Sequence, residues 1–169
     1  MLEMRVMGIA IDTATGSPII VLNDLDNRKA LPIWIGSAEA GAIIRKIENI
    51  KMARPMTHDL IIDIINKTGY HVDRVEINDV ENDTYYSSIW LVNDDGDEQE
   101  IDSRPSDAIA IAIRAEAPIF VSSKVLADGS VSCDAQKDEE ESEEFRNFIQ
   151  SIKPSDFERL LKDDKQSDQ

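Results

Sequence analysis

Residues 102–114 read DSRPSDAIAIAIR, a cluster of charged and hydroxyl side chains followed directly by six small or branched apolar residues. The run from Ala108 to Ile113 is apolar on every face, which is typical of a helix that is buried on most sides. Ser103 can cap this helix, Pro105 is tolerated in its first turn, and Asp107 suits the positive end of the helix dipole. The stretch therefore predicts a central core helix that begins in a polar cluster.

This helix start carries more polar side chains than capping requires. One hydroxyl or carboxylate is enough to cap a helix, whereas this start offers Asp102, Ser103, Arg104, Ser106 and Asp107. Two explanations are open. Asp107 can form a structural ion pair with a buried arginine, or the surplus polar groups can belong to a functional site.

Branched apolar runs and turn residues mark the other elements. Strands are expected at residues 4–12, 17–24, 29–36, 71–79, 84–94, 98–102 and 118–121, and helices over 37–50 and 57–69, the latter capped by Thr57. The apolar stripe of the second helix is expected to consist of Leu60, Ile61, Ile64 and Ile65. Because strands and helices do not alternate regularly, we expect an α+β fold in which about three helices pack on a mixed β-sheet.

The chain is long enough for one sizeable core. It has 169 residues, of which 41% are hydrophobic, and nothing in it requires two cores. After Cys133 the composition changes, and DEEESEE at 138–144 is typical of a solvated link. We expect a single domain over residues 1–133, followed by an acidic linker and a tail of short helices over 134–169.

The sequence also indicates where the protein acts. No apolar run approaches the roughly 18 to 20 residues that a membrane span needs, and the first residues lack the pattern of a signal peptide. With Cys133 as its single cysteine, the chain cannot form an internal disulfide. We expect a cytoplasmic protein without a membrane partner.

The charge of the chain restricts its interactions with nucleic acid. A formal net charge of -16 opposes non-specific coating of DNA, because that binding depends on Lys and Arg that neutralise phosphates. The one dense basic group along the sequence is Arg45, Lys46, Lys51 and Arg54. Nucleic acid is therefore expected to bind weakly through this region, with an affinity that falls steeply as salt is added.

Two segments of the chain share a local pattern. Both RPMTHDLI at 54–61 and RPSDAIAI at 104–111 contain Arg-Pro, then a hydroxyl residue, then an aspartate that enters an apolar helix. Either two helices simply start alike, or two arginine-bearing helix starts face a common cleft.

These motifs carry a resemblance to a known family. IWIGSAEAGAI (33–43), ARPMTHDL (53–60) and IDSRPSDAIAIAIRAEAPIFV (101–121), in this order and separation, resemble the bifunctional nuclease domain family of bacteria and plants. The resemblance covers about residues 4–130. It implies an α+β fold with a mixed sheet and an enzyme that hydrolyses both DNA and RNA.

The resemblance implies a phosphodiesterase site, for which the residues offer candidates. Hydrolysis needs a base or metal ion to activate water, and positive charge beside the phosphorus. The candidate catalytic residues are Glu39, His58, Asp102 and Asp107, with Asp59 as a further carboxylate. Glu39 and Asp107 are also candidate ligands for Mg²⁺ or Mn²⁺. The candidate substrate-binding residues are Arg45, Lys46, Arg54, Arg104 and Ser106.

Other functions stay open at this point. The chain has no Walker loop, dinucleotide fingerprint, zinc-ligand spacing or serine elbow. Besides a nuclease, it can be a non-enzymatic regulatory module that binds a nucleotide, a small anion or a protein partner through Arg54 and Arg104. It can also be a structural protein whose charged motifs hold the fold together. A homodimer is the default expectation for its assembly.

Overall fold

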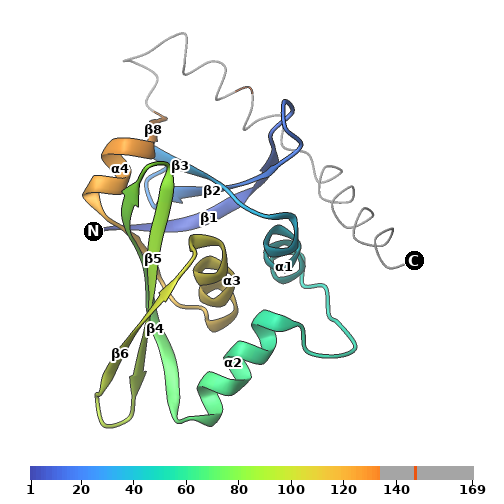
Figure 1. Ribbon diagram of the computed structural model, residues 1–169, viewed down its shortest axis with the longest axis vertical. Helices are drawn as coiled ribbons and strands as arrows, with labels where there is room; N and C mark the ends of the chain where they lie inside the picture. Colours follow the sequence, from blue (N-terminus) through green and yellow to red (C-terminus); the bar gives the residue numbers. More distant parts are fainter. Residues whose placement is uncertain (134–146, 148–169) are drawn as a thin grey trace.

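The fold is built from strands and helices in an irregular order. The structure is a computed structural model and describes residues 1–133 and residue 147 (Figure 1). The expected linker and tail over 134–169 lie, apart from that residue, outside the described residues. The described elements are β1 Leu2–Ile11, β2 Pro18–Asp24, β3 Lys29–Trp34, α1 Ser37–Ile47, α2 Thr57–Lys67, β4 Tyr70–Glu81, β5 Thr84–Asn93, β6 Glu98–Ser103, α3 Pro105–Ala115, β7 Ile119–Val121, α4 Ser123–Gly129 and β8 Val131–Ser132.

The described strands form one eight-stranded sheet in the order β6-β5-β4-β7-β1-β2-β3-β8. Two antiparallel meanders, β1–β2–β3 and β4–β5–β6, make up most of it. The short strand β7 joins them, because it pairs antiparallel with β1 and parallel with β4. The single parallel pair makes the sheet mixed, and the expected α+β class is confirmed.

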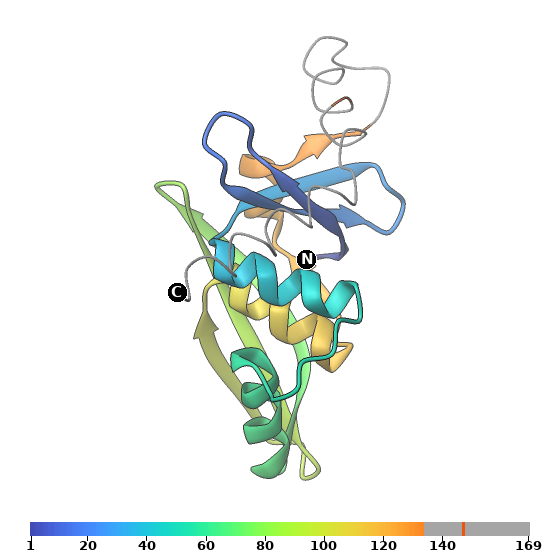
Figure 2. The ribbon, with the colours of Figure 1, turned by 90° about the vertical axis from the view of Figure 1, so that its right-hand side faces the viewer.

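The helix predicted from the opening stretch occupies the centre of the fold. α3 packs against β4 and β5 and also contacts α1 and α2 (Figure 2). Its residues Ala108, Ile109, Ala110 and Ala112 are fully buried. Burial of a single isoleucine side chain stabilises a fold by about 1.5 to 3 kcal/mol, so α3 is a major source of the core's stability.

The helices differ from the prediction in number and in their boundaries. The described residues contain four helices, whereas about three were expected. The additional one is the short helix α4, which Ser122 caps by accepting a hydrogen bond from the Val125 amide at 3.2 Å. Met56 rather than Thr57 is the N-cap of α2. Arg104 rather than Ser103 is the N-cap of α3, because Ser103 still belongs to β6, where its hydroxyl meets that of Ser87.

The buried face of α2 also differs from the expected stripe. Leu60 and Ile64 are 51% and 53% exposed, although both were expected to face the core. The residues that face inward are His58, Ile61, Ile62 and Ile65, which follow the same helical spacing one position further round. Ile61 and Ile65 thus face inward as expected, and His58, which the pattern of apolar residues does not reveal, shares the buried face with them. None of the helices over 1–133 is long and apolar enough to cross a membrane.

Candidate active site

The starts of α1, α2 and α3 bring four of the candidate residues together. Glu39 lies in the first turn of α1, His58 in the first turn of α2, and Arg104 and Asp107 at the start of α3. His58 Nε2 is 2.9 Å from Asp107 Oδ1, and Arg104 Nε is 2.8 Å from Asp107 Oδ2. Arg104 Nη2 also donates to Glu39 Oε1 at 2.9 Å. We call these four residues the His58–Asp107 network.

Local sequence explains why these side chains can meet. Arg104 has the extended backbone of an N-cap and Pro105 follows in the first turn, so the Arg104 side chain lies beside Asp107 three residues later. Gly36 is the N-cap of α1, and a Cβ atom there would collide with the Glu39 carboxylate. A glycine at this position therefore leaves the space into which Glu39 folds.

Burial and charge differ across the network. The His58 side chain is 9% exposed, whereas that of Arg104 is 67% exposed. Hydrogen bonds from Arg104 to Asp107 and Glu39 raise the pKa of the guanidinium. A carboxylate can only accept, so His58 donates Nε2–H to Asp107, and Nδ1 of the neutral ring keeps its lone pair. This nitrogen is then able to accept a proton.

The arrangement does not fit a divalent metal ion at Glu39 and Asp107. Both oxygens of Asp107 are engaged, one by His58 and the other by Arg104. Arg104 occupies the position between the two carboxylates that a cation would need. Within the part of the chain that the structure describes, no group of three or more His, Cys, Asp or Glu side chains could hold a metal ion.

The remaining candidates lie outside this network. Asp102 lines a separate hollow with Ser88 and Glu100, because alternate side chains of β6 point to opposite faces of the sheet. Arg54 is exposed in the connection between α1 and α2. Ser106 is in the first turn of α3 but is buried. The two Arg-Pro helix starts thus meet through His58 and Asp107, without a contact from Arg54.

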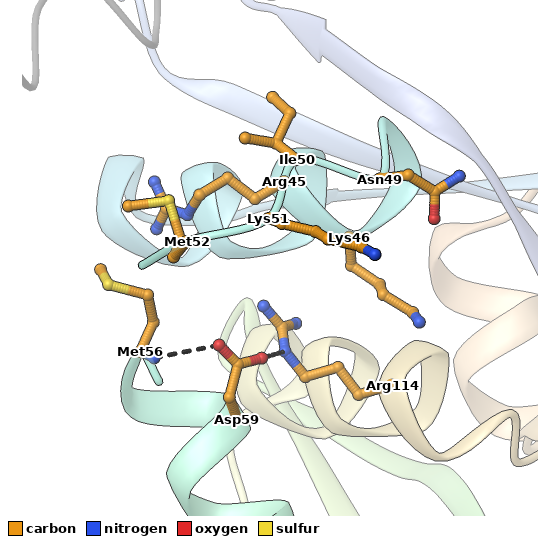
Figure 3. A pocket seen from close by; sticks show the side chains of 9 residues that line it. All are labelled: Arg45, Lys46, Asn49, Ile50, Lys51, Met52, Met56, Asp59 and Arg114. Atoms are coloured by element: carbon orange, nitrogen blue, oxygen red, sulfur yellow. Dashed lines mark hydrogen bonds and ion pairs between the residues drawn. The ribbon is translucent and has the colours of Figure 1, made fainter. Parts of the chain in front are cut away.

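Arg45 and Lys46 line an open pocket of about 350 Å³ between the α1–α2 connection and the start of α2 (Figure 3). Its lining residues are Arg45, Lys46, Asn49, Ile50, Lys51, Met52, Met56, Asp59 and Arg114. We call it the basic pocket, because four of these side chains are cationic and one is acidic.

Arg114 anchors the basic pocket to the helices. Its side chain is 8% exposed and donates to Asp59 Oδ1 at 2.7 Å, to the Ala42 carbonyl at 3.0 Å and to the Ala110 carbonyl at 2.9 Å. The hydrogen bond from Arg114 lowers the pKa of Asp59. Sequence reasoning missed Arg114, although its spacing of seven residues from Asp107 places both on one face of α3.

Comparison with known proteins identifies the family. A family model for the bifunctional nuclease domain matches residues 20–134. An uncharacterized protein of Mycobacterium tuberculosis is 36% identical over 163 residues, which cover 92% of this chain and 97% of that protein. The Bifunctional nuclease 2 proteins of Oryza sativa subsp. japonica and Arabidopsis thaliana are each 34% identical, over 117 and 111 residues.

The matched segments differ in how much of each relative they cover. The alignments include 68% and 63% of this chain but only 36% and 33% of the rice and Arabidopsis proteins, so the chain spans about a third of these plant relatives. The family match contains the whole His58–Asp107 network and the whole basic pocket. Because it covers more than half of the sequence, the chain belongs to the bifunctional nuclease domain family.

Proposed function

We propose that the protein hydrolyses phosphodiester bonds of DNA and RNA, and that the His58–Asp107 network is its active site. The observation that carries the proposal is the 2.9 Å contact between His58 Nε2 and Asp107 Oδ1 at the meeting point of three helix starts. Membership of the bifunctional nuclease domain family supports nuclease chemistry.

His58 acts as the general base in this proposal. Asp107 fixes the ring orientation and the tautomer, so that Nδ1 accepts a proton from a water molecule that attacks phosphorus. The oxygen of that water forms the new P–O bond while the bond to the leaving oxygen breaks. The imidazolium then returns its proton to the leaving oxygen or to solvent, and Asp107 stabilises the positive ring in the meantime.

Arg104 neutralises the charge that develops on the phosphate. Its Nε and Nη2 atoms are held by Asp107 and Glu39, while Nη1 makes no hydrogen bond to any other described residue. Because the side chain is largely exposed, Nη1 can donate to a phosphate oxygen that arrives from solvent. Glu39 is a positioning residue that aims the guanidinium, and the amides of the helix starts add further positive potential.

The test is hydrolysis of labelled single-stranded DNA and RNA by the full chain, with His58→Gln as the variant. A general base contributes roughly 10²- to 10⁴-fold to the rate, so we expect at least a hundredfold loss. The control is His71→Gln, which removes the other histidine of the chain from an exposed position on β4. Equal rates for both variants would remove His58 from the mechanism.

A second arm of the experiment addresses metal ions and the non-enzymatic alternative. Activity that persists in EDTA agrees with a site in which Arg104 lies between the carboxylates. Activity that depends strictly on Mg²⁺ or Mn²⁺ would require Arg104 to leave that position. Stoichiometric binding of nucleotides by the wild-type chain without any turnover would favour a regulatory module over a nuclease.

A further inference from the structure

The basic pocket contains positive charge that no acidic side chain of the described residues 1–133 pairs with. Arg45, Lys46 and Lys51 line it, and none of them takes part in an ion pair within the described part of the chain. Arg45 Nε is also buried there without a hydrogen-bond partner. A buried donor without a partner is rare in folded proteins, because it loses its hydrogen bonds to water.

Structural roles explain only part of this charge. Arg45 and Lys46 lie in the last turn of α1, where cations suit the negative end of the helix dipole. Lys51 lies beyond the helix, and Arg114 adds a fourth cation whose one acidic partner is Asp59. In a chain of net charge -16, so many cations around one pocket favour an anionic ligand.

The pocket also has an apolar wall. Ile50, Met52 and Met56 line it, and all three are exposed large hydrophobic side chains. Figure 3 shows the pocket residues around the space between the α1–α2 connection and the Asp59–Arg114 pair. A bare phosphate ion gains no affinity from an apolar surface, whereas an unstacked nucleobase gains affinity when it packs against one.

These features match the two halves of a nucleotide in a single strand. Proteins bind single strands through cations that follow the phosphates and through side chains, most often aromatic, on which free bases stack. In this pocket the apolar surface comes from Ile50, Met52 and Met56 instead. In a duplex the bases are stacked inside, so the apolar wall would remain uncovered. The volume of about 350 Å³ is at the lower end of the range for small-ligand sites, roughly 300 to 1,000 Å³.

The pocket and the proposed active site are adjacent along α2. His58 belongs to the active site, where it contacts Asp107, and the next residue, Asp59, lines the pocket. We infer that the basic pocket holds one unpaired nucleotide of a single-stranded DNA or RNA substrate, next to the bond that His58 hydrolyses. Its phosphate binds Arg45, Lys46 and Lys51, and its base lies on Ile50, Met52 and Met56. The inference rests on the proposed function and names its substrate as a single strand.

Binding can be measured by the fluorescence anisotropy of labelled oligonucleotides with the full chain at low salt. Wild-type protein should bind a single strand of thymidines or uridines at least tenfold more tightly than a hairpin duplex of equal length. Arg45→Gln/Lys51→Gln should weaken single-strand binding at least tenfold and make it less dependent on salt. The control Lys29→Gln/Lys67→Gln removes the same charge from exposed positions outside the pocket, and should weaken binding less than threefold.

The apolar wall is tested separately. Ile50→Ala/Met52→Ala should weaken single-strand binding about threefold or more, if each base loses part of its contact surface. Leu60→Ala/Ile64→Ala removes equally exposed apolar side chains of α2 that lie outside the pocket, and should leave the affinity unchanged.

The outcomes separate the inference from the proposed function. Equal affinity for single strands and duplexes, or equal effects of the pocket variant and its charge control, would overturn the inference even where hydrolysis continues. Absence of hydrolysis by wild-type protein, with single-strand binding still dependent on the pocket, would overturn the nuclease proposal and keep the binding site. His58→Gln that binds like wild type but no longer cleaves supports both.

Discussion

The His58–Asp107 network and the basic pocket are built on the same three helices, but they differ in whether their charged side chains form ion pairs. Each charged residue of the network has an oppositely charged partner, and the arginine bridges two carboxylates. The pocket instead contains Arg45, Lys46 and Lys51, none of which forms an ion pair with another residue in the described part of the chain. Paired charges fix the geometry of side chains, whereas unpaired charges stay available for a ligand. The comparison therefore predicts that substitutions in the two regions have different consequences.

The largest effect is expected for Asp107→Asn. This change keeps the size of the side chain but removes the carboxylate that holds His58 and Arg104, so hydrolysis should fall about 100-fold or more. A buried guanidinium left unpaired costs roughly 3 to 5 kcal/mol of stability, but Arg104 is largely exposed. We therefore expect a loss of only about 1 to 2 kcal/mol, measured by urea unfolding. A fully active and fully stable variant would show that the network has neither role.

The next largest effect is expected at the junction of the two regions. Arg114→Gln removes a nearly buried guanidinium that joins Asp59 of α2 to the Ala42 carbonyl of α1. Loss of these charge-assisted hydrogen bonds should lower the free energy of unfolding by about 2 to 3 kcal/mol. Arg54→Gln is the matched control at an exposed site, with a change within about 0.5 kcal/mol. Equal urea midpoints for both variants would mean that Arg114 does not anchor the helices.

A smaller effect should depend on pH. Arg114 lowers the pKa of Asp59 in the folded state, so Asp59 stabilises the fold above its unfolded pKa of about 3.9. This stability is lost as the pH falls through the lowered folded value. The stability difference between wild type and Asp59→Asn should thus stay constant down to about pH 5 and shrink as the pH falls below about 4. In an Arg114→Gln background the pH dependence should become smaller, because only the hydrogen bond from the Met56 amide and the charge of His58 still lower the pKa of Asp59. An unchanged pH dependence would assign it to other groups.

The smallest effect is expected in the basic pocket itself. Arg45→Gln/Lys51→Gln removes cations that have no acidic partner in the described chain, so the free energy of unfolding should stay within about 0.5 kcal/mol of wild type. Urea melts at low and high salt measure this change. A loss above about 1 kcal/mol would make these cations structural and would remove the contrast between the regions.

Local sequence patterns predicted most elements and part of the site. The apolar run after Asp107 predicts the buried helix α3, and branched apolar runs with their turn residues predict most strands of the two meanders. Titratable and charged side chains near helix starts predict a site that includes Glu39, His58, Arg104 and Asp107, and the structure brings these four together. Their roles in hydrolysis stay predictions, as does the domain boundary after Cys133.

Other features depend on contacts between distant parts of the chain. The buried face of α2 includes His58, whose partner Asp107 is 49 residues away. Arg114 follows an apolar run as a lone cation, and its partner Asp59 is 55 residues away. Asp102 looked like part of the helix start, but strand alternation directs it to the other side. The order of strands in the sheet is likewise a long-range property.

The position of β7 has a consequence for how the chain folds during synthesis. Each antiparallel meander is made of neighbouring segments and can pair early, because its contacts are local. In the described sheet, the two meanders are joined by Ile119–Val121, three residues that pair with β1 on one side and β4 on the other. In a nascent chain shorter than this point, the edges of β1 and β4 that β7 later covers are still unpaired, and such edges promote association with other chains. We therefore expect the chain to be more prone to aggregation before β7 emerges than after it has paired with both meanders.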